Sequence, residues 1–189
     1  MLSYVKLPFH FEPDCLKSDL DKILPDEWIL HFNKHDYEGK WSGIAFRAIG
    51  SDEHNIIPMR MPLMLFGDTP LLEHCPYIRK VLQTLECPQK SVRFLKLHAG
   101  SSIREHTDRE LEYENGEVRL HVPVLTNPEI EFYLNGERLK MQEGECWYTN
   151  VNLPHHIANH SASDRVHLVI DCVVNDWLRT VFEAAQLDR

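Results

Sequence analysis

The second half of the chain is a series of short segments in which hydrophobic residues alternate with polar ones. Such period-two alternation is typical of strands that have one buried face. An Asn135-Gly136 pair separates two of these segments, and this dipeptide favours a two-residue hairpin. Eight short strands cut by turns predict a small barrel or a jelly roll. The expected strands are 91–98, 103–106, 118–125, 129–134, 137–141, 145–149, 155–159 and 165–173.

The first ninety residues mix helical patterns with strand patterns. Apolar residues at helical spacing predict one helix between Asp14, a candidate N-cap, and Pro25. A second helix is expected to begin just after Pro76, since proline suits a first helical turn. Between the two helices, residues 28–32 and 41–47 have the composition of strands.

The chain has no internal repeat, low-complexity tract or linker, and its 189 residues are most simply one domain. We expect a mixed helix and strand part over residues 1–90 and a strand-rich core over residues 91–174. A C-terminal helix over residues 175–189 should follow, with Asn175 as its cap. The expected fold class is therefore mainly β, with flanking N-terminal and C-terminal helices.

The composition narrows the range of partners. A formal net charge of −9 does not suit nucleic-acid binding, which needs a basic surface. No apolar run approaches the roughly 20 residues of a transmembrane helix, and the N-terminus lacks the pattern of a signal peptide. Five cysteines without a C-x-x-C motif predict neither a disulfide framework nor a zinc knuckle. We expect a cytoplasmic protein with no nucleic-acid or membrane partner, and the sequence leaves homodimer formation open.

His106 and Asp108 form the most informative chemical pattern in the chain. They are two residues apart, so in an extended segment both side chains leave the same face. Together with a distant second histidine, such a pair is the ligand set that holds Fe(II) on one face and leaves the opposite face open. A His-x-Asp pair alone is common by chance, and the pattern therefore needs a third ligand.

The third ligand must come from the adjacent pair His155 and His156. A strand that starts here would point one side chain inward and the other outward. Because Leu153-Pro154 makes the turn into this strand rigid, we expect His155 to be the ligand. His156 is the alternative, and otherwise lies at the surface or beside the site.

Arg165 lies on the polar face of the last strand, ten residues after His155. A buried arginine is costly unless it meets an anion, and its planar guanidinium fits a carboxylate. In Fe(II) enzymes with this ligand set, an arginine in such a place holds the far carboxylate of 2-oxoglutarate. A partner such as Asp171, or a surface position, would also satisfy it. Arg119 and His121 form a second cationic pair on another strand, which adds positive charge to the cavity if it faces inward.

Several motifs, in this order, resemble the aspartyl/asparaginyl β-hydroxylase family, which also contains bacterial enzymes that hydroxylate free amino acids, such as the cis-proline hydroxylases. The similarity spans about residues 93–178 and, more weakly, residues 31–47. The motifs are His106-Thr-Asp108, Arg119-Leu-His121, Gly144-Glu-Cys-Trp-Tyr148, Leu153-Pro-His155 and Asn159-x-Ser161-x-x-x-Arg165-Val-His-Leu-Val-Ile-Asp171.

The resemblance implies a double-stranded β-helix, a fold also described as jelly-roll or cupin-like. It implies a single dioxygenase domain with Fe(II) at three residues, 2-oxoglutarate at Arg165, and contacts from Arg119 and His121 to co-substrate or substrate carboxylates. The expected reaction uses O2 and 2-oxoglutarate to hydroxylate an amino acid or a small carboxylate-bearing derivative. The implied catalytic and metal ligands are His106, Asp108 and His155.

The chain departs from the family pattern at two positions. Asp108 stands where the vertebrate peptide hydroxylase has glycine, so this chain has the fuller ligand set of the small-molecule branch. Leu95 stands where the family has a hydroxyl residue that assists the arginine. One alternative function is hydroxylation of aspartyl or asparaginyl side chains in a peptide or protein. A second alternative is a non-enzymatic cupin-like metal- and ligand-binding protein, in which Arg165 would have less reason to exist. A metal-dependent isomerase or hydrolase ranks last, because such an enzyme needs no arginine for a co-substrate.

Overall fold

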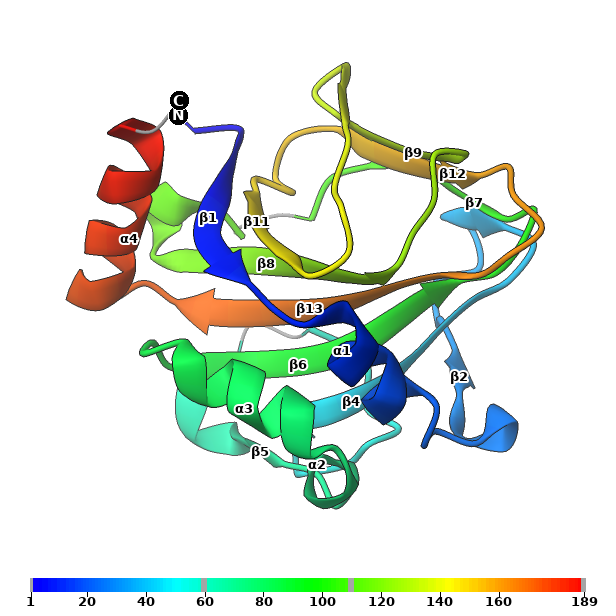
Figure 1. Ribbon diagram of the computed structural model, residues 1–189, viewed down its shortest axis with the longest axis horizontal. Coiled ribbons are helices and arrows are strands. Elements are labelled where there is room, and N and C mark those ends of the chain that lie inside the picture. The colour runs from blue at the N-terminus through cyan, green and yellow to red at the C-terminus, as the bar shows by residue number, and fades with distance from the viewer. Residues whose placement is uncertain (1, 59–60, 109–110, 188–189) are drawn as a thin grey trace.

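Two antiparallel sheets form the centre of the molecule (Figure 1). The computed structural model describes residues 2–58, 61–108 and 111–187. Within these residues, the larger sheet has the strand order β1-β11-β8-β13-β6-β4-β2, and β5 also pairs with β4. The smaller sheet has the order β10-β9-β12-β7-β3. Strands β6 to β13 pass repeatedly from one sheet to the other, which is the arrangement of a jelly roll.

The bounds of the elements are as follows. The larger sheet contains β1 (Tyr4–His10), β2 (Ile29–Leu30), β4 (Trp41–Ile49), β5 (Phe66–Asp68), β6 (Gln89–Leu97), β8 (Glu117–Leu125), β11 (Glu145–Thr149) and β13 (Arg165–Val173). The smaller sheet contains β3 (Tyr37–Glu38), β7 (Ser102–His106), β9 (Ile130–Leu134), β10 (Glu137–Leu139) and β12 (His155–Asn159). The helices are α1 (Pro13–Leu20), α2 (Leu71–His74), α3 (Pro76–Thr84) and α4 (Asp176–Leu187), and 3-10 turns lie at Pro25–Glu27, Leu63–Leu65 and Tyr113–Asn115.

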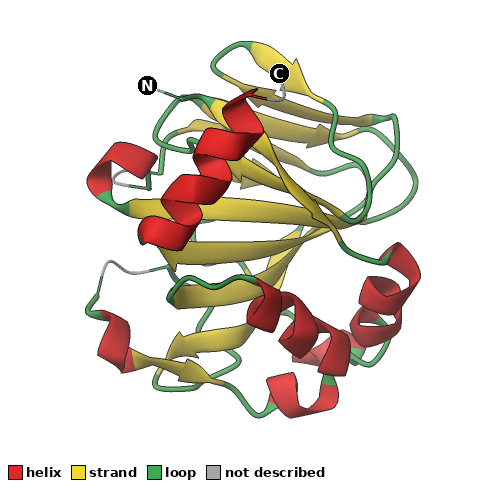
Figure 2. Cartoon of the chain, turned by 60° about the vertical axis from the view of Figure 1, so that its left-hand side comes forward, coloured by secondary structure: helices red, strands yellow, loops and turns green. Residues whose placement is uncertain are grey.

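The larger sheet separates an apolar outer core from an interior in which charged side chains lie beside a second, smaller apolar cluster. Its outer face packs against the helices (Figure 2), and Val166, Leu168 and Ile170 of β13 belong to this outer core. The alternate residues of β13, which begin with Arg165, face the smaller sheet instead. The alternation seen in the sequence therefore points charged side chains into the space between the two sheets.

The eight strands predicted between residues 91 and 173 are confirmed, with ends that differ by one or two residues. The predicted cap of α4 is also confirmed, because Oδ1 of Asn175 accepts a hydrogen bond from the backbone N–H of Leu178 at 3.0 Å. No helix among the described residues is long and apolar enough to cross a membrane.

The N-terminal part differs from the prediction in several places. Glu12, not Asp14, occupies the N-cap of α1, because Pro13 takes the first helical position and Asp14 falls in the first turn. The helix ends at Leu20, and a separate 3-10 turn begins at Pro25. The strand expected at 28–32 contains only the two residues of β2, and β1, β3, β5 and α2 were not predicted.

The buried side chain of Asn159 fixes the turn between β12 and β13. Its amide nitrogen donates to the carbonyl oxygens of Leu97, His98 and Ser163 at 3.1, 3.2 and 2.8 Å. Its carbonyl oxygen accepts from the backbone N–H and the hydroxyl of Ser161 at 3.1 and 2.7 Å. One side chain therefore ties the end of β6 to the start of β13.

We expect Asn159→Ala to lower the free energy of unfolding by about 2–4 kcal/mol, because several buried partners lose their hydrogen bonds together. Asn115→Ala is the matched control, since the Asn115 amide is exposed and bonds the neighbouring Glu112 side chain at 2.6 Å. Chemical denaturation measures the free energy of unfolding of both variants. Equal stability of the two variants would show that the turn does not depend on Asn159.

Candidate metal centre

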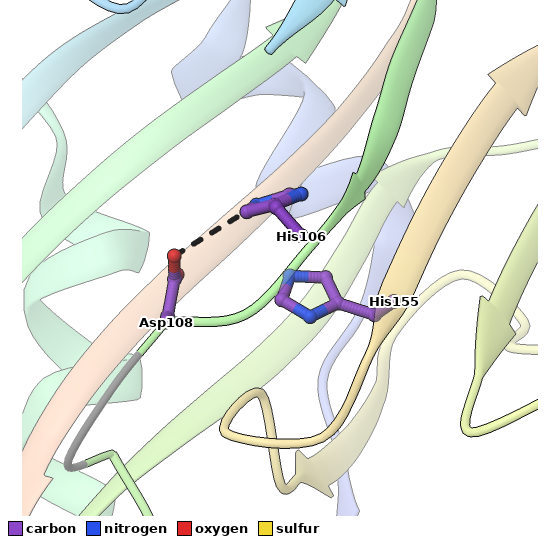
Figure 3. A group of neighbouring side chains, drawn as sticks. All are labelled: His106, Asp108 and His155. Atoms are coloured by element: carbon purple, nitrogen blue, oxygen red, sulfur yellow. Dashed lines mark ion pairs between the residues drawn. The ribbon is translucent and has the colours of Figure 1, made fainter.

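His106, Asp108 and His155 converge between the two sheets (Figure 3). One ligand atom of each side chain lies within 4.8 Å of those of the other two. His106 ends β7, Asp108 follows in the next loop, and His155 begins β12. Antiparallel pairing places His155 opposite His106, with ring centroids 4.2 Å apart. Strand pairing therefore brings the distant histidine to the His-x-Asp pair.

Both histidines present the same ring nitrogen to this group. Nδ1 of His106 lies 2.8 Å from the carbonyl oxygen of Arg104, and Nδ1 of His155 lies 3.0 Å from that of Leu153. Since a carbonyl oxygen can only accept, each Nδ1 donates a hydrogen bond to it, and Nε2 is the ring nitrogen left for the group. Burial, with His106 as the next cause, lowers the pKa of His155 to about 4, so this ring is neutral at pH 7.

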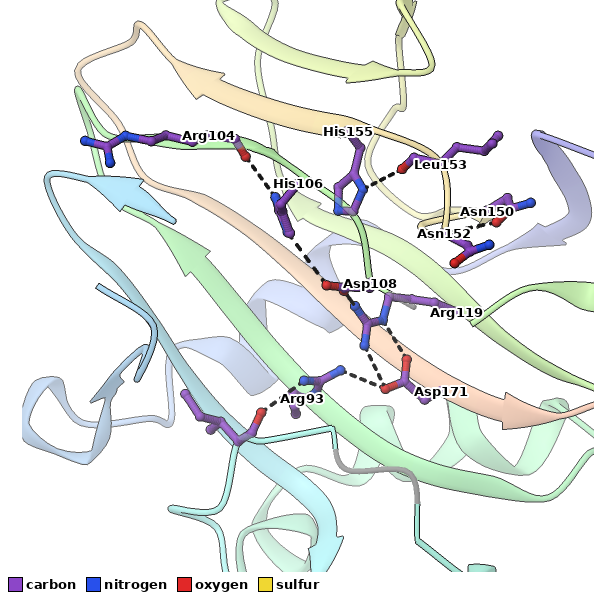
Figure 4. A network of polar contacts seen from close by, with 11 residues as sticks. Arg93, Arg104, His106, Asp108, Arg119, Asn150, Asn152, Leu153, His155 and Asp171 are labelled. Atoms are coloured by element: carbon purple, nitrogen blue, oxygen red, sulfur yellow. Dashed lines mark hydrogen bonds and ion pairs between the residues drawn. The ribbon is translucent and has the colours of Figure 1, made fainter. Parts of the chain in front are cut away.

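Arg119 holds Asp108 from the opposite side (Figure 4). Nη1 of Arg119 donates to Oδ2 of Asp108, and Oδ1 lies 3.7 Å from Nε2 of His106. Burial alone would raise the pKa of the Asp108 carboxyl, but Arg119 and the two histidines outweigh it and lower that pKa. Asp108 is therefore an oriented carboxylate with one oxygen turned toward the histidines.

A buried network of charges continues from Arg119 into the larger sheet. Nε and Nη2 of Arg119 donate to the two oxygens of Asp171 at 2.7 and 3.1 Å. Nη2 of Arg93 donates to the same carboxylate at 2.9 Å, and all three residues are buried, each at most 5% exposed. Asp171 was a candidate partner for Arg165, but it pairs with two other arginines, and Arg93 had been given no role.

Arg165 lies inside the barrel without a carboxylate partner among the described residues. It is 3% exposed, and its Nε has no hydrogen-bond partner. Nη2 of Arg165 lies 3.0 Å from Nδ1 of His167. Burial lowers the pKa of Arg165 to about 9. A buried cation in this situation is costly until an anion binds to it.

His121 faces the same interior, but it lacks the positive charge expected of it. Its Nδ1 lies 3.4 Å from Nδ1 of His167, and its Nε2 has no partner. Burial first, and then the nearby Arg165, lower the pKa of both histidines well below the usual range. The two rings are therefore neutral, and Arg119 with His121 is not a cationic pair.

One cavity unites the residues that the sequence singled out. The six candidate site residues that line it are His106, Asp108, Arg119, His121, His155 and Arg165. Apolar side chains, among them Trp41, Leu95 and Phe132, complete its wall. His156 is absent from this lining, and its ring stacks on Tyr133 with centroids 4.8 Å apart. Among the two adjacent histidines, the described geometry therefore favours His155.

His31 is a further buried residue near the cavity, to which the sequence analysis assigned no role. Its ring stacks on the Trp41 ring with centroids 3.6 Å apart. Neither Nδ1 of His31 nor Nε1 of Trp41 has a hydrogen-bond partner. His31 opens the weakly similar segment 31–47, but only its packing against a cavity residue indicates a place near the site.

Solved structures share this fold at low sequence identity. The carbocyclase SnoK from nogalamycin biosynthesis, described as non-heme and alpha-ketoglutarate dependent, gives a TM-score of 0.59 at 11% identity over 90% of this chain and 80% of that one. A 2OG-Fe(II) oxygenase family oxidoreductase from Burkholderia pseudomallei gives 0.56 at 13% identity, over 92% and 86%. A Pseudomonas putida prolyl-4-hydroxylase gives 0.53 at 11% identity, over 92% and 93%. These similarities establish the predicted double-stranded β-helix.

Sequence comparison finds a more similar relative. The L-proline cis-4-hydroxylase of Rhizobium meliloti (strain 1021) is 29% identical over 136 residues, which are 70% of this chain and 48% of that protein. The chain thus spans about half the length of this curated relative. The model of the family described as Aspartyl/Asparaginyl beta-hydroxylase matches residues 14–174, which include every residue that lines the cavity. The chain belongs to the aspartyl/asparaginyl β-hydroxylase family.

Proposed function

We propose that this chain is an Fe(II)/2-oxoglutarate-dependent hydroxylase that acts on an amino acid or a small amino-acid derivative. One observation carries the proposal: a single cavity contains a His, Asp, His group and a buried arginine without a counterion. The first group suits Fe(II), and the arginine suits the far carboxylate of 2-oxoglutarate. The similarity to an L-proline cis-4-hydroxylase supports a small substrate.

The side chains of the group fit an Fe(II) ion. Two imidazole nitrogens and one carboxylate oxygen are the donor set typical of non-haem Fe(II) oxygenases. The bonds from each Nδ1 to a backbone carbonyl would fix the rings of His106 and His155, and Arg119 would fix the carboxylate of Asp108. When bound, the iron would supply the O2 chemistry that couples oxidative decarboxylation of 2-oxoglutarate to hydroxylation of a C–H bond.

Arg165 would hold the far carboxylate of 2-oxoglutarate. A guanidinium can donate two parallel hydrogen bonds to a carboxylate, and Nε of Arg165 has no other partner. The contact of its Nη2 with Nδ1 of His167 would keep the guanidinium in position. Leu95, which replaces the family's hydroxyl residue, lines the cavity and can donate nothing through its side chain. The unpartnered Nε2 of His121 is the further polar atom that could contact the co-substrate.

Arg119 remains our candidate for the substrate carboxylate. It lines the cavity beside Asp108, and its Nε, Nη1 and Nη2 each donate to a carboxylate already. A guanidinium has five N–H donors, so a second N–H on each of the Nη atoms stays available. Its position between Asp108 and Asp171 would keep this donor pair rigid while a substrate binds.

Anaerobic addition of Fe(II) and 2-oxoglutarate is expected to give the weak visible charge-transfer band of a 2-oxo acid bound to iron. Asp108→Ala and His155→Ala should each abolish the band, because each removes one of the three ligands. His156→Ala is the matched control, since the His156 ring stacks on Tyr133 and is absent from the cavity lining. A band that survives His155→Ala but disappears in His156→Ala would reverse the ligand assignment.

Arg165→Ala should raise the KM for 2-oxoglutarate by a factor of tens or more, since a charge-assisted contact in a desolvated site is worth on the order of 2–4 kcal/mol. The affinity for iron should change little. Arg179→Ala, which removes an exposed guanidinium from α4, controls for the loss of one positive charge. Steady-state kinetics with varied 2-oxoglutarate measures the effect, and an unchanged KM would remove Arg165 from the site.

Free amino acids are expected to stimulate succinate formation from 2-oxoglutarate in the presence of Fe(II) and ascorbate. Arg119 would provide the positive group that an amino-acid carboxylate needs inside a protein of net charge −9. Pools of amino acids and of peptides are compared in the same assay. Stimulation by peptides alone would favour hydroxylation of aspartyl or asparaginyl side chains instead.

A further inference from the structure

A second and larger cavity lies at the other end of the barrel. In the pairing of β13 with β8, Asp171 is opposite Arg119 near the metal group, whereas Val166 is opposite Leu125 at the far end. The second cavity, of about 640 Å³, adjoins this far end, and we call it the outer cavity. The cavity at the metal group, of about 40 Å³, is the inner cavity. The outer cavity is lined by residues 126–128 and 138–143 and by Ile130, Phe132, Arg165 and His167.

The two cavities meet at Phe132 and Arg165, the two described residues that line both. The guanidinium carbon of Arg165 lies 5.8 Å from the centroid of the Phe132 ring. Arg165 can therefore be reached from the outer cavity without passing the three candidate metal ligands. The inner cavity has room for only a few water molecules, because one water needs about 10–15 Å³ of such space. A dicarboxylate that came from the metal end would have to pass the three candidate metal ligands before it reached Arg165.

The outer cavity is positively charged in a chain whose net charge is −9. Lys140 and Arg165 have no acidic partner among the described residues, while Arg138, also in the lining, pairs with Glu131 at 3.4 Å. Glu143, the acidic side chain of the described lining, is paired with Lys17 at 2.6 Å. A cleft lined by one sign of charge attracts ions of the opposite sign and raises their rate of entry.

The geometry points to the outer cavity as the route by which 2-oxoglutarate reaches Arg165 and the dicarboxylate product leaves. Arg119, our candidate for the substrate carboxylate, lines the inner cavity and not the outer one, so the amino-acid substrate would enter at the metal end, opposite to 2-oxoglutarate. The inference rests on the proposed function and adds to it a separate passage that Phe132 closes. A dicarboxylate can then exchange while the amino-acid substrate occupies the metal end.

Charge reversal inside and outside the outer cavity tests the route. Lys140→Glu reverses a charge in the lining of the outer cavity. Lys34→Glu makes the same change of net charge outside that cavity. Lys34 lies in the loop whose His35 and Asp36 carbonyl oxygens accept hydrogen bonds from Arg104, two residues before His106. Stopped-flow mixing measures 2-oxoglutarate association by the charge-transfer band of the anaerobic Fe(II) protein and by tryptophan fluorescence of the metal-free protein. We expect Lys140→Glu to slow association about threefold to tenfold at low ionic strength and little at high salt. Lys34→Glu should match the wild type.

Gln142→Trp tests the passage by bulk instead of charge. Gln142 is exposed and lines the outer cavity, so a larger side chain should narrow the route without touching Arg165. The association and dissociation rates of 2-oxoglutarate should fall by the same factor, with Kd and the KM for the amino-acid substrate unchanged. Slowing in Lys34→Glu but not in Lys140→Glu, or unaltered rates in Gln142→Trp, would overturn the route. Failure of the wild type to bind 2-oxoglutarate would overturn the proposed function instead.

Discussion

The ion pairs of the Asp171 carboxylate hold the charged groups inside the barrel in place. It accepts hydrogen bonds from Arg93 and Arg119, and Arg119 in turn holds Asp108. Loss of one member of a buried ion pair typically costs about 3–5 kcal/mol, because the remaining charge is left uncompensated. Two guanidinium groups share this one carboxylate. The orientation of the Asp108 carboxylate, which Arg119 holds, is therefore coupled to the stability of the larger sheet.

Much of the fold could be predicted because its signals are local. Alternation and turn residues such as Asn135-Gly136 depend on neighbours in the sequence, and they located the eight core strands within one or two residues. The short strand β3 could not be predicted, since two residues carry no periodicity, and β2 was predicted at its place but too long. They exist because β2 pairs with β4 and β3 pairs with β7. Strand β1 is likewise defined by its pairing with β11.

The sequence was sufficient to predict which residues form the candidate site, but not which side chains they contact. Alternation placed Arg165 and Arg119 on the polar faces of two strands, and in the structure both line the cavity. Which carboxylate each arginine meets depends on the registers of β6, β8 and β13, which no local pattern fixes. The neutrality of His121 depends on its depth of burial in the same way. Residue types and spacing thus indicate which side chains form the site, and the registers of the paired strands determine which of these side chains contact one another.

An anion that binds to Arg165 would also stabilise the folded protein. A ligand that binds the native state alone adds RT ln(1 + [L]/Kd) to the free energy of unfolding, which is about 2.7 kcal/mol at one hundred times Kd. Differences of about 1–2 kcal/mol can change the abundance of a protein in a cell several-fold, because unfolded chains are degraded. Through Arg165, the supply of a small dicarboxylate would therefore set the lifetime of this protein as well as its rate of turnover.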